Sequence, residues 1–341
     1  MNVRPMRSIN SSLRLADSAP RAAVSIDVHH HFNPTLEDNE GNPWSLSLAL
    51  DEMDRNGVDT AIASLGPVND NGSKDRPRRV REWNEWGTRA CQDHPGRFGL
   101  FASLPFPHVD LALAEISFAY DMLRADGIGL CTSEGEVWLG DERNWPILEE
   151  LNRRKSVVFV HPAATSNCSA ISRAYGGDLI SSPWVEFPTN TTRAVLGLLA
   201  NGVTRKYPDI RFIFSHGGGT MPFLLGRIAG FTGWKTVGVE TLETLFPDGI
   251  YAEFAKFYFD CAQALAPETV ELLRAVVPVS HLLFGSDFSY FPIGCSVDQF
   301  SALALNESDR RAIGGGNAAE LFPRFQSRKS PGSQERDLRA Y

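Results

Sequence analysis

The sequence lacks the features that define several large classes of protein. Its five cysteines include no C-x-x-C pair, which argues against a disulfide framework and against a cysteine-built zinc site. No apolar run approaches the roughly 20 residues that a membrane-spanning helix needs. The net charge is −8, so no general basic field would attract nucleic acid. The composition therefore predicts no nucleic-acid partner and no membrane partner, and the scattered cysteines fit a reducing cytoplasm.

Two glycine-rich nucleotide-binding motifs are also missing. A dinucleotide-binding fold would carry a glycine fingerprint after its first strand, whereas the first strand here runs into histidines. The run Gly217-Gly218-Gly219 does not fit the pattern of a phosphate-binding loop and is typical of a tight strand-to-helix turn. A catalytic thiol at Cys261 or Cys295 is an alternative, although isolated cysteines more often serve as small buried hydrophobes.

The chain length of 341 residues fits either two domains or one barrel-sized domain. Residues 1–20 contain arginines and serines with a single acid, which predicts a disordered leader, with a mitochondrial presequence as the alternative. Residues 326–341 are polar and include Pro331 and Gly332, which predicts a flexible tail. We therefore expect one packed domain over residues 21–325.

Eight short β-type runs alternate with segments of helical character. Several runs are almost continuously apolar, which is typical of parallel strands covered on both faces. The runs are Val24–Phe32, Val58–Leu65, Phe98–Leu104, Gly127–Thr132, Val157–Pro162, Ile210–His216, Phe257–Ala262 and Leu282–Phe288. Helical spacing covers Leu48–Asn56, Val80–Asp93, Leu111–Arg124, Asn144–Arg154 and Thr191–Lys206, with Asn190 or Thr191 as a candidate N-cap for the last segment. Eight such repeats predict an α/β fold, a (β/α)8 TIM barrel, rather than an open doubly wound sheet.

Five residues with metal-binding or acid–base side chains stand at the ends of these runs: His29, His31, His161, His216 and Asp287. The carboxyl ends of the strands form the mouth of such a barrel, so these residues are expected to meet there. Because side chains alternate along a strand, His29 and His31 share one face and His30 points away, toward the helices. Three imidazoles and one carboxylate suit one divalent metal ion, with zinc the first expectation and manganese the second.

On their own, the consecutive histidines are also compatible with ordinary, partly solvated side chains or with an incidental metal-binding tract. The downstream residues favour the metal site, because they reach the same barrel end from three other strands.

Longer motifs surround these residues. They are Asp27-Val-His-His-His-Phe-Asn-Pro34, Asn84-Glu85, His94-Pro-Gly-Arg-Phe-Gly99, Trp138-Leu-Gly-Asp141, Val158-Phe-Val-His-Pro162, Glu186-Phe-Pro188, Thr191-Thr-Arg193, Phe214-Ser-His-Gly-Gly-Gly219, Gly226-Arg227-Ile228 and Phe284-Gly-Ser-Asp287. Over about residues 22 to 325 this pattern resembles the decarboxylase branch of the amidohydrolase superfamily, which includes decarboxylases of 2-amino-3-carboxymuconate-6-semialdehyde, γ-resorcylate, 6-methylsalicylate and isoorotate. The first and last motifs together make the resemblance specific.

The resemblance implies an amidohydrolase-type barrel and a single divalent metal ion. It assigns the metal ligands to His29, His31, His161 and Asp287, and it makes His216 an unliganded catalytic histidine.

Three further residues are candidates for substrate binding. Arg227 matches a family arginine that can reach the substrate carboxylate of a neighbouring subunit, which implies a homodimer or homotetramer; a surface arginine is the alternative. Asn84 matches a position near the substrate, with a helix-surface role as the alternative. Phe288 could form an apolar wall over an aromatic substrate or pack within its own loop.

Two positions depart from the family pattern. Glu134 follows Thr132-Ser133 where the family often has tyrosine, and Asn190 stands where relatives frequently carry aspartate. These changes leave the metal ligands alone but affect which substrate is expected. The short segment from Asn33 to Leu46 favours a phenolic acid over isoorotate.

The activity implied is the non-oxidative loss of CO2 from a small aromatic or muconate-type carboxylic acid, with a hydroxybenzoate as the first expectation. Losing CO2 leaves an electron pair on carbon, so the carbon must be protonated or the charge delocalised. A metal orients the carboxylate and stabilises charge on oxygen. Asp287 is the preferred proton donor, and His216 the group that polarises or deprotonates a hydroxyl or a metal-bound water.

Two other functions remain open at this stage. A lactone or amide hydrolase, or a hydratase, of the same superfamily would use nearly the same residues. The fourth run, Gly127–Thr132, carries no lysine that could bridge two metals, which favours a single ion. A non-catalytic metal-binding barrel would leave five polar groups at the mouth without a task.

Overall fold

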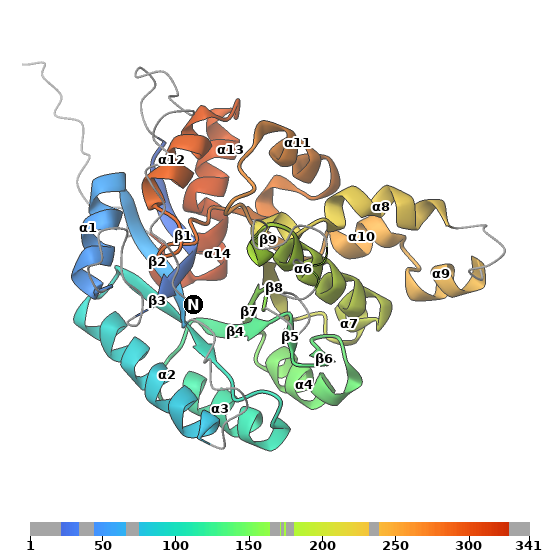
Figure 1. Ribbon diagram of the computed structural model, residues 1–341, viewed down its shortest axis with the longest axis horizontal. Coiled ribbons are helices and arrows are strands. Elements are labelled where there is room, and N and C mark those ends of the chain that lie inside the picture. Colours follow the sequence, from blue (N-terminus) through green and yellow to red (C-terminus); the bar gives the residue numbers. More distant parts are fainter. Residues whose placement is uncertain are drawn as a thin grey trace, which may run out of the picture.

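Eight parallel strands form the centre of the fold and helices surround them, as the computed structural model shows (Figure 1). The structure describes residues 22–33, 44–65, 75–163, 171, 174, 181–231 and 239–326. The leader predicted over residues 1–20 lies outside these ranges, as does the tail apart from Gln326. Within the described ranges, no helix has both the length and the apolar character that crossing a bilayer would require.

The strands follow one another around the sheet in chain order. They are β1 (Val24–Phe32), β2 (Val58–Leu65), β3 (Phe98–Ser103), β4 (Gly127–Cys131), β7 (Val157–His161), β8 (Arg211–Phe214), β9 (Tyr258–Asp260) and β10 (Leu282–Leu283). The segment after β10 returns to β1, where Val28 N–H donates to the Phe284 carbonyl over 3.0 Å and a parallel bridge joins His30 to Phe288. These contacts close the sheet into the predicted (β/α)8 barrel. A two-stranded hairpin of β5 (Ser133–Glu134) and β6 (Val137–Trp138) follows β4.

Helices lie between most successive strands. Those that the structure describes are α1 (Leu46–Asn56), α2 (Arg76–Asp93), α3 (Val109–Asp121), α4 (Trp145–Arg153), α6 (Ser182–Ala200), α7 (Val203–Lys206), α8 (Met221–Gly230), α9 (Val239–Leu245), α10 (Ile250–Phe254), α11 (Pro267–Val276), α12 (Ile293–Ala302), α13 (Glu307–Arg311) and α14 (Asn317–Leu321). Local sequence sets their ends. For α1, the Ser45 hydroxyl accepts from Leu48 N–H, and Gly57 ends the helix in the left-handed conformation.

The predicted N-cap at Asn190 or Thr191 is wrong, because both residues lie inside α6, which begins at Ser182. The helix continues through Pro188, although proline has no N–H to donate and its ring crowds the preceding turn. The hydroxyls of Thr191 and Thr192 instead bond back to the carbonyls four residues earlier, and Asn190 donates to the Ala163 carbonyl over 2.9 Å. Tertiary contacts of this kind override the local signal.

The core has two parts. One cluster fills the barrel, with Ile26, Ile62, Phe101, Phe159 and Ile213 contributed by five strands. The larger cluster lies between the sheet and the helices. Residues of and after α14 pack on the interior cluster near the amino ends of the strands, where Arg324 binds Asp126. That end of the barrel is therefore filled, and the chemistry is left to the carboxyl end.

Candidate active site

A β-bulge in β1 sets the direction of the consecutive histidines. Ile26 and Val28 face the barrel interior, so strict alternation would also turn His30 inward. The pairing with β2 shifts between Asp27 and His30, which adds one residue to β1 and reverses the alternation. His29 and His31 consequently face the mouth. His30 is fully buried on the other side, with its ring centroid 5.0 Å from that of Phe288, as the prediction for His30 required.

Four imidazoles and one carboxylate meet at the carboxyl end of the barrel. The ring centroids of His29, His31 and His161 lie 5.0–5.2 Å apart, and that of His216 lies 4.9 Å from His29. Asp287 lies among them: its Oδ1 is 3.2 Å from His29 Nε2 and 3.0 Å from His31 Nε2, and its Oδ2 is 3.3 Å from His216 Nε2. All five residues predicted to meet do so.

Distances alone do not separate the ligands from the catalytic histidine. One ligand atom each from His29, His161, His216 and Asp287 lie within 4.8 Å of one another, so a metal ion could be held by this set. His31 Nε2 contacts Asp287 Oδ1, the same oxygen that His29 Nε2 contacts. The donors form a histidine and aspartate metal-binding site in either case.

The other ring nitrogen distinguishes His216 from the remaining three histidines. His29 Nδ1 lies 3.0 Å from Asp260 Oδ2, His31 Nδ1 2.9 Å from Ser64 Oγ, and His161 Nδ1 2.8 Å from the Pro162 carbonyl oxygen. Such partners fix a ring and leave Nε2 free for a metal. Among the described residues, the Nδ1 atom of His216 has neither a hydrogen bond nor an ion-pair contact; its ion pair with Asp287 is made through Nε2.

Two buried aspartates organise the site, and sequence reasoning gave neither a role. Asp260 ends β9, and its Oδ1 accepts from the backbone N–H groups of His216 and Ala262. Asp27 accepts from the N–H groups of His29 and Ser286 and from the Ser286 hydroxyl at 2.6 Å, so it ties the bulge to the turn before Asp287. The criterion that selected the five predicted residues, an acid–base or metal-binding side chain at the end of a predicted strand, would also have selected Asp260.

The backbone around these groups is specialised. His216 and Asp287 have φ values of 55° and 62°, which are uncommon for residues other than glycine and recur at functional sites. Gly285 permits the close approach of two site residues. A Cβ at this position would lie 2.8 Å from His29 Cβ and 3.0 Å from Asp260 Oδ1.

The charges of the site favour a bound cation. Burial lowers the pKa of His29, but Asp260 and Asp287 outweigh it and the pKa is raised to about 10. Burial would raise the pKa of Asp287, yet His29 and the hydrogen bonds from His216, His29 and His31 hold it well below its usual value. Burial also lowers the pKa values of His31 and His161. Two buried carboxylates around one imidazole fit a divalent ion, because its charge can replace the proton.

The three predicted substrate-binding residues lie outside this cluster. Arg227 is exposed on α8, with its guanidinium 5.5 Å from the Phe231 ring centroid. Asn84 is buried and donates to the Ser103 carbonyl and to Glu115 Oε1, while its own Oδ1 accepts from Ser103 N–H. Phe288 packs on His30. Contacts of these three residues with a substrate stay predictions, and the packing of Asn84 and Phe288 does not support them.

The two departures from the family pattern also have partners. Both oxygens of Glu134 bind the guanidinium of Arg76, at the start of α2. Asn190 Oδ1 accepts from Arg193 in addition to the Ala163 contact. Both residues therefore join segments that follow strand ends, and neither leaves an unpaired charge at the mouth.

Tyr290 is the aromatic residue of the β10 loop that contacts a metal-ligand candidate. Its ring centroid lies 5.2 Å from that of His31, and its hydroxyl oxygen accepts from Asn33 Nδ2 over 3.1 Å. Burial, opposed in part by the Asn33 hydrogen bond, raises the pKa of this phenol, which stays protonated at neutral pH.

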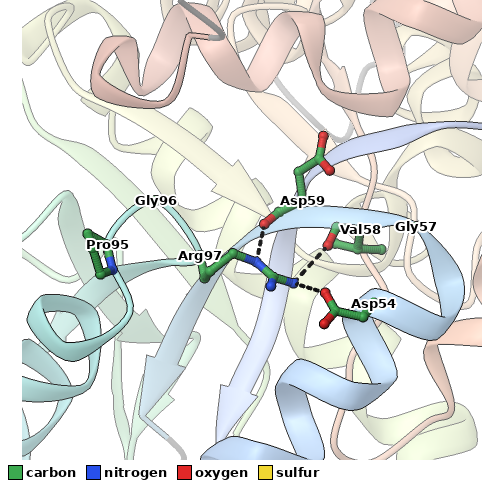
Figure 2. Close-up of a pocket in the computed structure, with 7 residues that line it drawn as sticks. All are labelled: Asp54, Gly57, Val58, Asp59, Pro95, Gly96 and Arg97. Carbon is green, nitrogen blue, oxygen red and sulfur yellow. Dashed lines mark hydrogen bonds and ion pairs between the residues drawn. The ribbon is translucent and has the colours of Figure 1, made fainter.

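A separate hollow lies at the opposite end of the barrel, at the amino end of β2 (Figure 2). Arg97 crosses it, donating to Asp54 Oδ1 over 2.6 Å and to the Asp59 carbonyl over 2.8 Å. These contacts tie Arg97, which precedes β3, to the last turn of α1 and the start of β2.

The chain is similar to known proteins both in sequence and in structure. The amidohydrolase family model matches residues 26–324. Decarboxylase macB of Penicillium terrestre is 34% identical over 327 residues, covering 88% of this chain and 95% of the relative. The 6-methylsalicylic acid decarboxylase of Penicillium expansum is also 34% identical, covering 89% and 97%.

The crystal structure of a dihydroxybenzoic acid decarboxylase from Polaromonas sp. JS666, with bound manganese and the inhibitor 2-nitroresorcinol, superposes with a TM-score of 0.76. Its identity is 20%, over 90% of this chain and 98% of that chain, so it supports the fold. The chain belongs to the amidohydrolase family. Its relatives place it in the branch whose named members are decarboxylases, which are carboxy-lyases.

Proposed function

We propose that the protein is a metal-dependent, non-oxidative decarboxylase of a small aromatic carboxylic acid, with a hydroxybenzoate as the substrate class. The observation that carries this proposal is the cluster of His29, His31 and His161 around Asp287, with His216 on its other side. The named activities of relatives at 34% identity support it.

We assign the metal ligands to His29, His31, His161 and Asp287. The support is the Nδ1 partner of each histidine, which leaves Nε2 free for a metal. Zinc suits this donor set, and manganese is the second candidate because the Polaromonas structure contains it. A bound divalent ion would orient the substrate carboxylate and stabilise negative charge on oxygen.

His216 and Asp287 would carry the proton. His216 Nε2 takes the proton of the substrate hydroxyl and passes it to Asp287 Oδ2, which lies 3.3 Å away. Asp287 then protonates the ring carbon that bears the carboxylate, and the bond to that group breaks with release of CO2. Since Asp287 is ionised at rest, it must receive a proton in each cycle before it can donate one.

Metal analysis and a substrate panel test this function. Purified protein should contain about one divalent ion per chain and release CO2 from at least one hydroxybenzoate in a panel that also holds muconate-type acids and lactones. Asp287→Asn and His216→Ala should each abolish turnover while the fold survives. His216→Ala should keep its metal, and His31→Ala should lose it. Hydrolysis of a lactone without CO2 release would favour the hydrolase alternative.

We further infer an assembly of two or four chains in which Arg227 acts at a neighbouring subunit. The exposure of Arg227 on α8 supports this, as do the exposed aromatic side chains of Phe223 on the same helix and Trp184 on α6. Light scattering after gel filtration would give the number of chains. Arg227→Ala should raise KM for the carboxylate substrate.

We infer a reducing, cytoplasmic location from the cysteines. The four in the described ranges, Cys91, Cys131, Cys261 and Cys295, are unpaired. Fractionation of the source cells would test it.

A further inference from the structure

Tyr290 and Asn33 form a polar pair beside the metal-ligand candidates, and the proposed mechanism does not use it. Asn33 Nδ2 donates to the Tyr290 hydroxyl oxygen over 3.1 Å. The Tyr290 ring meets His31 edge to face, at an interplanar angle of 72°. Tyr290 N–H also donates to the Asp287 carbonyl over 3.0 Å. The phenol is therefore anchored to the turn that carries the catalytic carboxylate.

The hydrogen bond from Asn33 determines how the phenol can act. A hydroxyl group has one proton to donate, and its oxygen accepts separately. Because the Asn33 amide occupies an acceptor position on the oxygen, the proton is left for a different partner. None of the described residues accepts that proton, so it is available to a ligand at the mouth.

Exposure indicates which part of a ligand would meet Tyr290. Tyr290 is 47% exposed, whereas His31 is 1% exposed and Asp287 is 5% exposed. The phenol thus lies at the outer edge of the site. The carboxylate of an aromatic acid, with one adjacent hydroxyl, would be drawn to the inner, metal-binding part. A second substituent at the other ortho position would lie across the carboxylate from that hydroxyl, farther from the metal, and we take the phenol at the outer edge as its neighbour.

We propose that Tyr290 is a specificity-determining residue, whose hydroxyl donates a hydrogen bond to a second ring hydroxyl of the bound aromatic acid. It thereby raises the affinity for a dihydroxylated acid relative to the counterpart that carries a methyl group at that place. A site that hydrogen-bonds a ligand oxygen discriminates against an analogue that lacks it. Asn33 is the positioning residue for this contact. The inference rests on the proposed function, because it requires an aromatic acid in the site.

Calorimetric titration of the zinc-loaded protein in the His216→Ala background, which is expected to hold metal and form no product, tests the contact without turnover. The two ligands are 2,6-dihydroxybenzoate and 2-hydroxy-6-methylbenzoate, which differ only at the second substituent. In Tyr290→Phe, which keeps the ring against His31, the Kd of the dihydroxy acid should rise about tenfold and that of the methyl acid less than about twofold. Tyr258→Phe is the matched control, because that phenol packs on His281 at the amino end of the barrel and should change neither Kd.

Asn33 gives a second measurement of the same hydrogen bond. Asn33→Ala should weaken binding of the dihydroxy acid by roughly threefold, and the variant that combines it with Tyr290→Phe should bind no more weakly than Tyr290→Phe alone. A role of Asn33 in folding alone would instead give additive losses for both ligands.

The possible failures are distinguishable. Equal weakening of both acids in Tyr290→Phe, or no change in either, would overturn the specificity role. Wild-type protein that binds both acids and releases no CO2 would refute the proposed function and leave this inference standing. Wild-type protein that binds neither acid would overturn the inference together with its ligand class.

Discussion

Replacing Asp260 with asparagine should disable the metal site without removing any metal ligand. Asp260 Oδ2 lies 3.0 Å from His29 Nδ1, and Oδ1 accepts from two backbone N–H groups, those of His216 and Ala262. An asparagine has only one oxygen. If that oxygen keeps the two backbone hydrogen bonds, the amide NH2 faces His29 Nδ1 and favours the tautomer with its proton on Nε2, the atom needed for the metal.

The size of the effect follows from losing this one partner of a ligand histidine. Removal of such a partner weakens metal binding by about 10- to 100-fold, which is about 1.4 to 2.7 kcal/mol. Both side chains are fully buried, so water cannot replace the carboxylate. Competition with a chromogenic chelator would give the zinc Kd of the wild-type and Asp260→Asn proteins, and turnover at limiting zinc should fall in parallel.

Asp126→Asn is the matched control. Asp126 is a half-buried residue whose carboxylate forms an ion pair with Arg324 at the amino end of the barrel, so its loss should lower stability and leave the zinc Kd unchanged. An unchanged zinc Kd in Asp260→Asn would refute the account of how His29 is oriented. An equal loss in both variants would mean that general destabilisation, and not the tautomer, weakens the site.

Three further predictions concern packing and charge. His30→Ala should lower the free energy of unfolding, measured by denaturant titration, by about 2 kcal/mol, because the ring packs on Phe288 away from the mouth. The variant should still bind about one metal ion per chain, and a metal-free variant would show that His30 was assigned to the wrong face of the strand. Gly285→Ala should lower the free energy of unfolding by roughly 1–3 kcal/mol and the zinc affinity by at least about tenfold, because the added methyl group would press on His29. Calorimetry that shows wild-type zinc affinity would contradict this. Hydrogen bonds from Arg153, and also from Arg154, lower the pKa of Glu150 in the folded protein to about 2. The ion pair therefore stabilises the fold fully above pH 4.5, the pKa of Glu150 in the unfolded chain, and this stabilisation is lost as the pH falls toward 2. Glu150→Gln should therefore cost about 0.5 kcal/mol in urea titrations at pH 7, and the difference from wild type should shrink below pH 4.5; a constant difference would exclude the ion pair as its source.

The strand pattern was predictable because parallel strands buried on both faces leave an apolar signal. The bounds of β1 and β2 agree with the predicted runs, Val24–Phe32 and Val58–Leu65. The last run was predicted through Phe288, whereas β10 ends at Leu283. Beyond it the chain bonds to β1 and turns at Asp287, whose φ is 62°. Hydropathy does not report such a change in backbone direction.

The site residues that stand at strand ends could be predicted from the sequence. The groups that orient them through contacts with neighbouring strands or with the backbone could not. The orientation of His29 and His31 depends on a bulge that composition does not reveal, although counting within the histidine run gave the correct face. Ser64 and the Pro162 carbonyl fix their histidines through contacts across strands or in the backbone. A single sequence carries no pattern for such contacts, since they depend on register and on the turn geometry.

Decarboxylation itself is tested most directly with a hydroxybenzoate labelled with carbon-13 in its carboxyl group, incubated with metal-loaded protein in D2O. The proposed mechanism predicts one labelled CO2 for each phenol formed, and one deuterium on the ring carbon that lost the carboxylate. It also predicts that His216→Ala, although it holds metal, forms neither product. Retention of the label in every product, with oxygen from water incorporated into a lactone substrate, would contradict the claim that the protein is a decarboxylase.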